Sequence, residues 1–131
     1  MPIDIRWYDT SHSIIWLQFS SPWNWHDFAA IHERTMDFVS SVNHRVCYLI
    51  DLTNVRHLPP GLPLSSIYPV LRVSHPNSVS YVIIGAKPSI HKTLTILLRV
   101  MRLSTHIMFV NTTEEGVQMI QSRLSALNSG T

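Results

Sequence analysis

Asp51, Thr53 and His57 follow one apolar segment of this chain, and their side chains could do chemistry. The segment itself, residues 46–50 (Val-Cys-Tyr-Leu-Ile), predicts a strand that is buried on both faces of a parallel sheet. We expect this strand to end at Asp51, which would place the carboxylate where strand meets loop. Binding chemistry in open α/β sheets usually lies at that edge. The carboxylate, hydroxyl and imidazole could bind a ligand, or serve an enzyme if they lay within hydrogen-bond reach of one another.

Other patterns typical of enzymes and metal sites are missing from the sequence. The four glycines, Gly61, Gly85, Gly116 and Gly130, cannot form a phosphate-binding loop, a dinucleotide fingerprint or a G-x-S-x-G turn. The eight histidines include no H-x-x-x-H pair, and a single cysteine allows no C-x-x-C pair. We interpret Cys47 as a small core residue. The sequence therefore favours a protein that is not an enzyme, with no catalytic residues, no metal and no cofactor.

Residues 51–61 also carry a family pattern. An apolar strand is followed by Asp-Leu-Thr, a small residue, Val55, two further residues and a turn that contains Gly61. This pattern resembles the STAS domain of anti-sigma-factor antagonists, in which a phosphorylatable serine lies just ahead of the glycine. Here Pro59 and Pro60 take those positions, so the phosphorylation switch is missing.

The resemblance implies a STAS-like fold and a non-enzymatic, regulatory protein-interaction module. In the family, partners bind the loop after the central strand and the helix that follows it. Carried over to this chain, the implied partner-binding residues are Leu58, Pro59, Pro60, Gly61, Leu62 and Ser65.

The hydrophobic spacing predicts one α/β domain over residues 1–131. Strands are expected at 3–7, 14–19, 46–51, 79–84 and 106–110. Helices are expected from Ser21 or Asn24 to Val42, at 64–73, at 90–103, and after a capping box at Thr112–Glu115. The resulting order is β-β-α-β-α-β-α-β-α, with four helices around a mixed, mostly parallel sheet. An opening hairpin and then strand–helix repeats form the STAS-like arrangement, which lipid carriers of the CRAL-TRIO type share.

The predicted helix 90–103 carries two apolar strips. One strip faces the core, and the second (Ile96, Val100 and Leu103) lies more than a quarter turn away, next to Arg99. One helix cannot bury both strips against a single sheet. The second strip therefore packs on a neighbouring helix, or it forms a surface for a homodimer or another protein.

Composition narrows the class of protein further. The chain is 45% hydrophobic and 14% charged, with a net charge of +2, and no Asp or Glu occurs between Asp51 and Glu114. The basic residues between these two positions favour an acidic ligand, an anionic partner surface or a self-complementary dimer; the alternative is a solvated basic face. As an alternative to the interaction module, the chain could carry a small apolar or acidic amphiphile, with Trp23, Trp25, Asp51, Thr53 and His57 binding it.

Two further classes are not expected. The basic residues are spread over several elements without interleaved aromatic residues, so we expect no nucleic-acid partner. No apolar run approaches the length of about 18–20 residues that crosses a bilayer, and no signal peptide is recognised. We therefore expect a cytoplasmic protein without an integral membrane segment.

Overall fold

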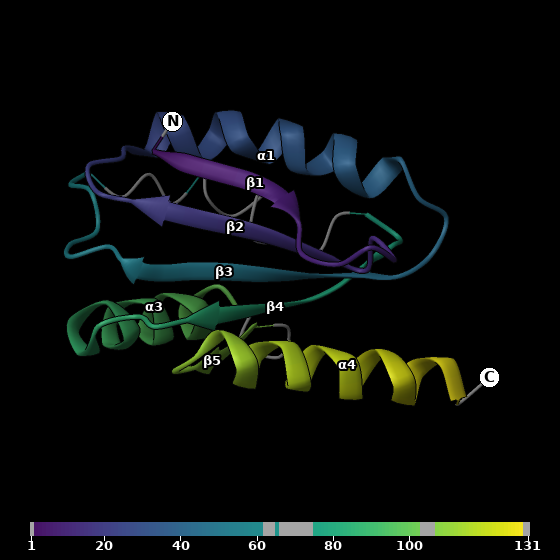
Figure 1. Cartoon of the computed structure of the whole chain (residues 1–131). Coiled ribbons are helices and arrows are strands. Elements are labelled where there is room, and N and C mark those ends of the chain that lie inside the picture. The colour runs from purple at the N-terminus through teal and green to yellow at the C-terminus, as the bar shows by residue number, and fades with distance from the viewer. Residues whose placement is uncertain (1, 62–64, 66–74, 103–106, 130–131) are drawn as a thin grey trace.

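A computed structural model of the chain describes residues 2–61, 65, 75–102 and 107–129, arranged around one five-stranded sheet. The strands lie in the sheet in the order in which they occur in the sequence (Figure 1). Their bounds are Ile3–Trp7 (β1), Ile14–Ser20 (β2), Val46–Asn54 (β3), Ser78–Ile84 (β4) and Ile107–Val110 (β5).

The pairing of the strands confirms the predicted mixed, mostly parallel sheet. β1 and β2 form an antiparallel hairpin in which Ile5 lies opposite Leu17. β2, β3, β4 and β5 are all parallel to one another, with Leu49 between Trp16 and Val82. The predicted helix at 64–73 falls outside the described residues, apart from Ser65.

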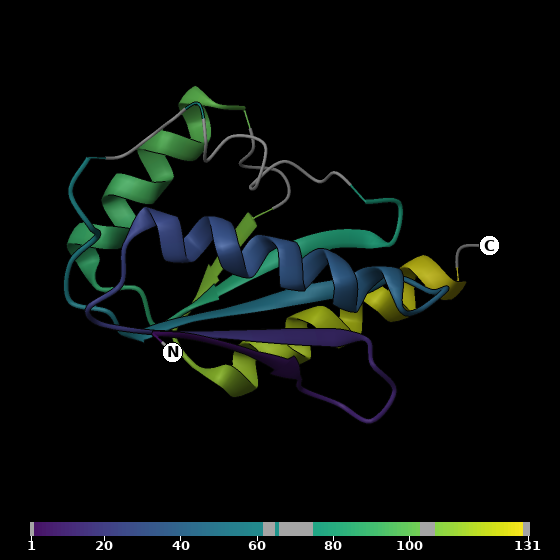
Figure 2. The same cartoon turned by 90° about the horizontal axis from the view of Figure 1, so that it is seen from above.

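The described helices cover both faces of the sheet. Helices α1 (Trp25–Ser40) and α3 (Pro88–Val100) lie on one face, and α4 (Thr113–Ser129) lies on the other (Figures 1 and 2). Two separate apolar clusters correspond to these two faces. Ile31 of α1 and Leu98 of α3 belong to the larger cluster, and Ile120 of α4 belongs to the smaller one.

Capping residues set the helix starts. The Asn24 side chain accepts a hydrogen bond from the Asp27 N–H (2.8 Å), and the Asp27 carboxylate accepts one from the Asn24 N–H (3.0 Å). The predicted start at Asn24 is therefore confirmed, and the alternative start at Ser21 is wrong. At α4, the Thr112 hydroxyl accepts a hydrogen bond from the Glu115 N–H (3.2 Å), as the predicted capping box requires.

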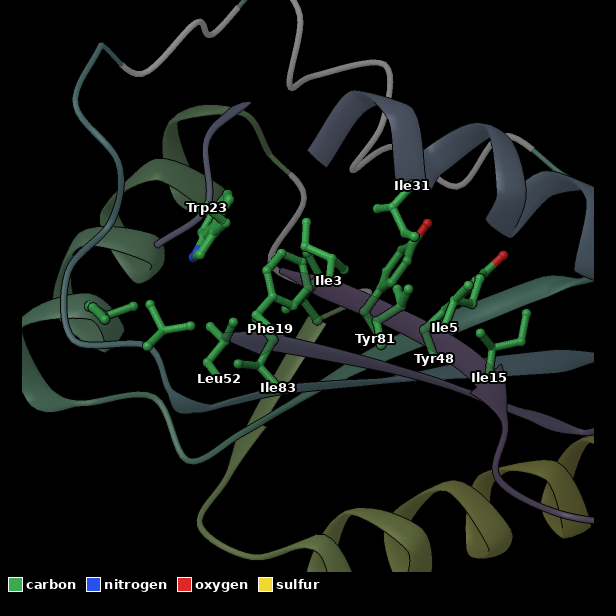
Figure 3. Packing of buried hydrophobic residues seen from close by; sticks show 14 of the residues in the cluster. Ile3, Ile5, Ile15, Phe19, Trp23, Ile31, Tyr48, Leu52, Tyr81 and Ile83 are labelled. Carbon is green, nitrogen blue, oxygen red and sulfur yellow. The ribbon is translucent and has the colours of Figure 1, made fainter. Parts of the chain in front are cut away.

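Tyrosines fill the centre of the larger cluster. The rings of Tyr48 and Tyr81 stack with centroids 4.5 Å apart, and Figure 3 shows their side chains rising from neighbouring strands beneath α1. The Tyr48 hydroxyl is hydrogen-bonded to the Ser78 hydroxyl. Burial disfavours the phenolate and raises the pKa of Tyr48 to about 12; it also raises the pKa of Tyr81.

The smaller cluster depends on close packing of α4. A Cβ added at Gly116 would lie 2.8 Å from Leu49 Cδ1, so the missing side chain lets the helix approach β3. Ile120 and Cys47 are fully buried in the same cluster. Burial raises the pKa of the Cys47 thiol, which agrees with its interpretation as a core residue.

The central strand is longer than predicted, and this changes the position of Asp51. β3 continues to Asn54, which pairs with Ser20 of β2 across an irregularity in the ladder. The expectation that the strand ends at Asp51 is wrong, because hydrogen bonding to β2 continues after the apolar run stops. Asp51 therefore lies within the sheet, between Gln18 and Ile84.

Candidate functional site

Asp51, Thr53 and His57 do not form one site. Asp51 is buried and alternates with Ile50 and Leu52, whose side chains belong to the cluster under α1 and α3; its carboxylate therefore lies on the face that carries α4. There it accepts a hydrogen bond from the Thr53 N–H (2.9 Å). Thr53 and His57 are exposed. None of the three is among the residues that line the cavities under α1 and beside the tryptophans.

Trp23 and Trp25 are brought together on the opposite face. Their ring centroids lie 5.0 Å apart at an interplanar angle of 78°, and the Trp23 ring also lies 5.0 Å from that of Phe19. Trp23 is buried and Trp25 is half-buried. The five residues predicted for ligand binding thus do not form one site: the Asp51 carboxylate lies on the face opposite the tryptophan pair, and the tryptophan pair borders a cavity.

The tryptophan pair contacts the loop predicted to bind a partner. The Trp25 indole N–H donates a hydrogen bond to the Pro59 carbonyl over 3.1 Å, which joins this loop to the start of α1. Leu58 borders the same cavity as the two tryptophans. Leu58 and Pro59 are half-buried, Pro60, Gly61 and Ser65 are exposed, and Leu62 lies outside the described residues.

The cavity beside the tryptophans has a volume of about 60 Å³, and its lining is entirely apolar. The described residues that line it come from β2, β3, β4, α1, α3 and the loops next to α1 and β3: Phe19, Trp23, Trp25, Phe28, Ile50, Leu52, Leu58, Ile83, Leu94 and Leu97. A neighbouring cavity of about 30 Å³ lies under α1 beside Tyr48 and His32. Phe19, Phe28 and Ile50 belong to the walls of both cavities.

The second apolar strip of α3 is exposed. Ile96 is 53% exposed and Val100 is 73% exposed, whereas Leu97 and Leu98 on the inner side are buried. The alternative that this strip packs on a neighbouring helix is therefore wrong for these two residues. Leu103, the third member of the predicted strip, lies outside the described residues.

Cationic side chains surround this strip. Lys92, Arg99 and Arg102 are all exposed, and the first turn of α3 holds no acidic residue. Lys92, Thr95, Ile96 and Arg99 line a shallow hollow together with Pro88 and His91. The His91 ring stacks on Phe109 of the edge strand β5, with centroids 4.2 Å apart. The outer face of α3 therefore combines exposed apolar side chains with positive charge.

Neither a metal cluster nor a membrane span is found in the described part of the chain. No three His, Cys, Asp or Glu side chains among these residues gather to hold a metal ion. No helix within the same ranges is both long and apolar enough to cross a membrane. A scan against protein-family models found no match to this chain, and searches of curated proteins and of solved structures found none either.

Sequence reasoning missed most of the cavity wall. Phe19, Leu52 and Leu94 come from three separate elements, and no local pattern in the sequence groups them. The one signal in the sequence was the pair of tryptophans at the start of the first helix. The hydrogen bond from Trp25 to Pro59 joins residues 34 positions apart and leaves no local pattern.

Proposed function

We propose that this protein is a non-enzymatic interaction module of the STAS-like type that acts in the cytoplasm and binds another protein through the outer face of α3. The docking surface comprises Ile96, Val100 and the flanking cations Lys92, Arg99 and Arg102. The exposure of Ile96 and Val100 carries the proposal. These residues are four positions apart, so they form one stripe on the helix surface.

The charge of this face points to the chemistry of the partner. An apolar strip bordered by carboxylates would cover Ile96 and Val100 and pair with the three cations. A symmetric dimer built on α3 alone suits the surface less well, because it would bring the Arg99 and Arg102 side chains of both copies together. We therefore commit to a different, acidic protein as the partner.

The STAS-like assignment is supported by the residue pattern at 51–61 and by the order of strands and helices around the central strand. In that scheme the second of four helices would fall at residues 64–73. Pro59 and Pro60 carry no hydroxyl, so a kinase cannot switch docking at these positions. Binding through α3 would then be constitutive, or controlled in another way.

The size of the cavities bears on the alternative function as a carrier. The larger volume, about 60 Å³, is less than half of the roughly 150 Å³ that accommodates one benzene molecule in an engineered apolar cavity. A lipid tail does not fit beside the tryptophans as the side chains stand. The exposed strip on α3 is therefore the better basis for a function.

Site-specific photo-crosslinking in cells tests the proposal. A photoreactive amino acid at Val100 should crosslink to an acidic protein, whereas the same group at Ala29, which is exposed on α1, should not. Arg99→Glu should then weaken the Val100 crosslink by charge reversal. Crosslinks from Val100 to a second copy of this chain would contradict the acidic partner and indicate a homodimer instead. No crosslink from Val100, or equal products from both positions, would overturn the proposal.

A further inference from the structure

Strand β1 forms one border of the sheet (Figure 2). Among the described residues, no strand pairs with its outer side. The backbone N–H and C=O groups along such an edge can pair with a strand of another chain. The residues of β1 determine which strand would fit there.

The hydrogen bonds to β2 show which backbone groups of β1 remain free. The Pro2 carbonyl accepts a hydrogen bond from the Ser20 N–H, and the Tyr8 N–H donates one to the Ile14 carbonyl, each over 2.8 Å. Both bonds follow the antiparallel register of the two strands, in which bonded pairs alternate with pairs that lack these bonds. The even-numbered residues of β1 therefore bond to β2. The odd-numbered residues direct their N–H and C=O groups to the free edge: Ile3, Ile5 and Trp7.

The side chains of β1 alternate between the two faces of the sheet. Ile3 and Ile5 are buried on the face that carries α1, as Figure 3 shows. Asp4 and Arg6 lie on the other face, where both are exposed. The Arg6 guanidinium lies 4.4 Å from the centroid of the Trp16 ring in β2, which holds this positive charge close to the sheet. This face of β1 therefore carries one negative and one positive charge two residues apart.

One antiparallel register between two copies of β1 satisfies both the backbone and the charges. The free groups can bond only where odd-numbered residues oppose odd-numbered residues. Registers that place Asp4 opposite Asp4, or Arg6 opposite Arg6, bring like charges together and are unfavourable. With Ile5 opposite Ile5, each Asp4 lies opposite the Arg6 of the other copy. Registers shifted further pair fewer residues of β1.

A hollow beside β1 fits the same arrangement. It has a volume of about 60 Å³ and lies between the start of β1 and α1, where Ile3, Ala30 and Ile31 line it. In the register centred on Ile5, the half-buried Trp7 lies opposite Ile3 of the second copy. Both side chains are then on the face that carries the hollow. Each indole would therefore extend the apolar cover over the start of the other copy's β1.

We propose that this chain forms a two-fold symmetric dimer in which two copies of β1 pair antiparallel around Ile5 and join their sheets into one continuous sheet. The order of Asp4 and Arg6 is complementary to itself, so the edge fits a second copy of this chain. A short strand edge buries less area than a standard interface, and the dissociation constant should be on the order of 100 μM. The inference is independent of the proposed function, because it uses the backbone of β1 and no side chain of α3.

Charge reversal tests the pairing in sedimentation equilibrium of the full chain. Arg6→Asp replaces two attractive cross-strand pairs with two repulsive pairs, so the dissociation constant should rise about tenfold or more. Asp4→Arg should have the same effect. The double variant Asp4→Arg/Arg6→Asp restores opposite charges and should dimerise within about threefold of the wild type. An equimolar mixture of the two single variants should form a heterodimer.

A matched control separates pairing from net charge. Lys87→Asp makes the same change of charge at an exposed position after β4, and β2 and β3 lie between β4 and β1. It should leave the dissociation constant of the dimer unchanged. Circular dichroism of every variant checks that the fold is retained.

Amide hydrogen exchange identifies the edge that pairs. The Ile5 and Trp7 N–H groups should exchange about tenfold or more slowly in concentrated wild-type protein than in Arg6→Asp, because they are bonded only in the dimer. The Tyr8 N–H is bonded to Ile14 within one copy and should be protected in both proteins.

Three outcomes would refute the inference. The first is a wild-type chain that stays monomeric at about 1 mM. The second is a dimer that Arg6→Asp does not weaken. The third is a dimer that Val100→Glu dissociates while the Ile5 and Trp7 amides exchange rapidly throughout, which would assign the contact to α3. A monomeric wild type would leave the crosslink expected from Val100 to an acidic protein unaffected.

Discussion

Gly85 and Gly61 share a backbone conformation but differ in the space around them, and this difference can be measured. Both have positive φ angles, +66° and +73° respectively. A Cβ added at Gly85 would lie 2.5 Å from Thr53 Oγ1 and 3.2 Å from Thr53 Cα. A Cβ added at Gly61 meets no heavy atom of the described residues within 4 Å.

These distances give different costs for the same substitution. The left-handed backbone alone should cost about 1–2 kcal/mol for an alanine at either position. At Gly85 the clash with Thr53 adds about 1–3 kcal/mol, which is typical of overpacking. Gly85→Ala should therefore lower the free energy of unfolding by about 2–5 kcal/mol, and Gly61→Ala by about 1–2 kcal/mol.

Urea denaturation followed by circular dichroism would measure both losses, with equal m-values as the condition for comparing them. The Thr53→Ala substitution adds a third arm, since it removes the nearest atom but leaves Cα and Cβ, each 3.2 Å from the added Cβ. It should recover about 1 kcal/mol in the Gly85→Ala background and change the wild type by less than about 0.5 kcal/mol. Equal losses for the two glycine variants would refute the assignment of a tight contact between β3 and the turn after β4.

Four further outcomes are expected. Ile120→Ala should destabilise the fold by about 2–5 kcal/mol in urea denaturation, because Ile120 is fully buried, and Met119→Ala, at a site 37% exposed, should cost less than about 0.5 kcal/mol. Burial lowers the pKa of His32, and the opposing effect of Glu33 is smaller. The free energy of unfolding should therefore fall as the pH drops below 6.5, because the unfolded state takes up the proton first. The same dependence of this free energy on pH between 7.5 and 5.5 in His32→Gln would contradict the prediction. The pKa of Tyr48 is raised to about 12, and that of Tyr81 is raised as well. Both tyrosines therefore contribute stability below pH 10 that is lost as the pH rises toward 12. Phenolate absorbance that reaches its full value near pH 10 in the folded protein would contradict this prediction. The buried Cys47 thiol should react with a disulfide reagent only after denaturation, and rapid labelling of the native protein would contradict its position in the core.

The sequence could predict those parts of the fold that short-range chemistry determines. The Asn24–Asp27 and Thr112–Glu115 pairs act within one turn of helix, so their residue types indicated both helix starts, although the sequence also allowed a start at Ser21. Continuous apolar runs and alternating apolar residues likewise located all five strands, with ends displaced by at most three residues. The end of β3 could not be predicted, because its last hydrogen bonds depend on the neighbouring strand and not on hydrophobicity.

The candidate sites were harder to predict for the same reason. Asp51 and Trp25 were assigned to one ligand site of a possible carrier, but residue parity in β3 places the Asp51 side chain on the opposite face of the sheet from Trp25. Helical spacing predicted a second apolar strip that includes Ile96 and Val100, but it left open whether a neighbouring helix covers this strip; both residues are exposed. Which backbone groups of β1 face its free edge depends on the pairing with β2 and cannot be read from residue types.

The strand order β1-β2-β3-β4-β5 also constrains how the chain can fold. Each strand pairs with the one synthesised just before it, so every new strand finds its edge already formed. The sheet can therefore grow in one direction while the chain is still leaving the ribosome, and no strand has to be inserted between two others. The growing edge of the sheet is always that of the newest strand and is covered as soon as the next strand arrives, whereas β1 forms the opposite edge of the described sheet from the start.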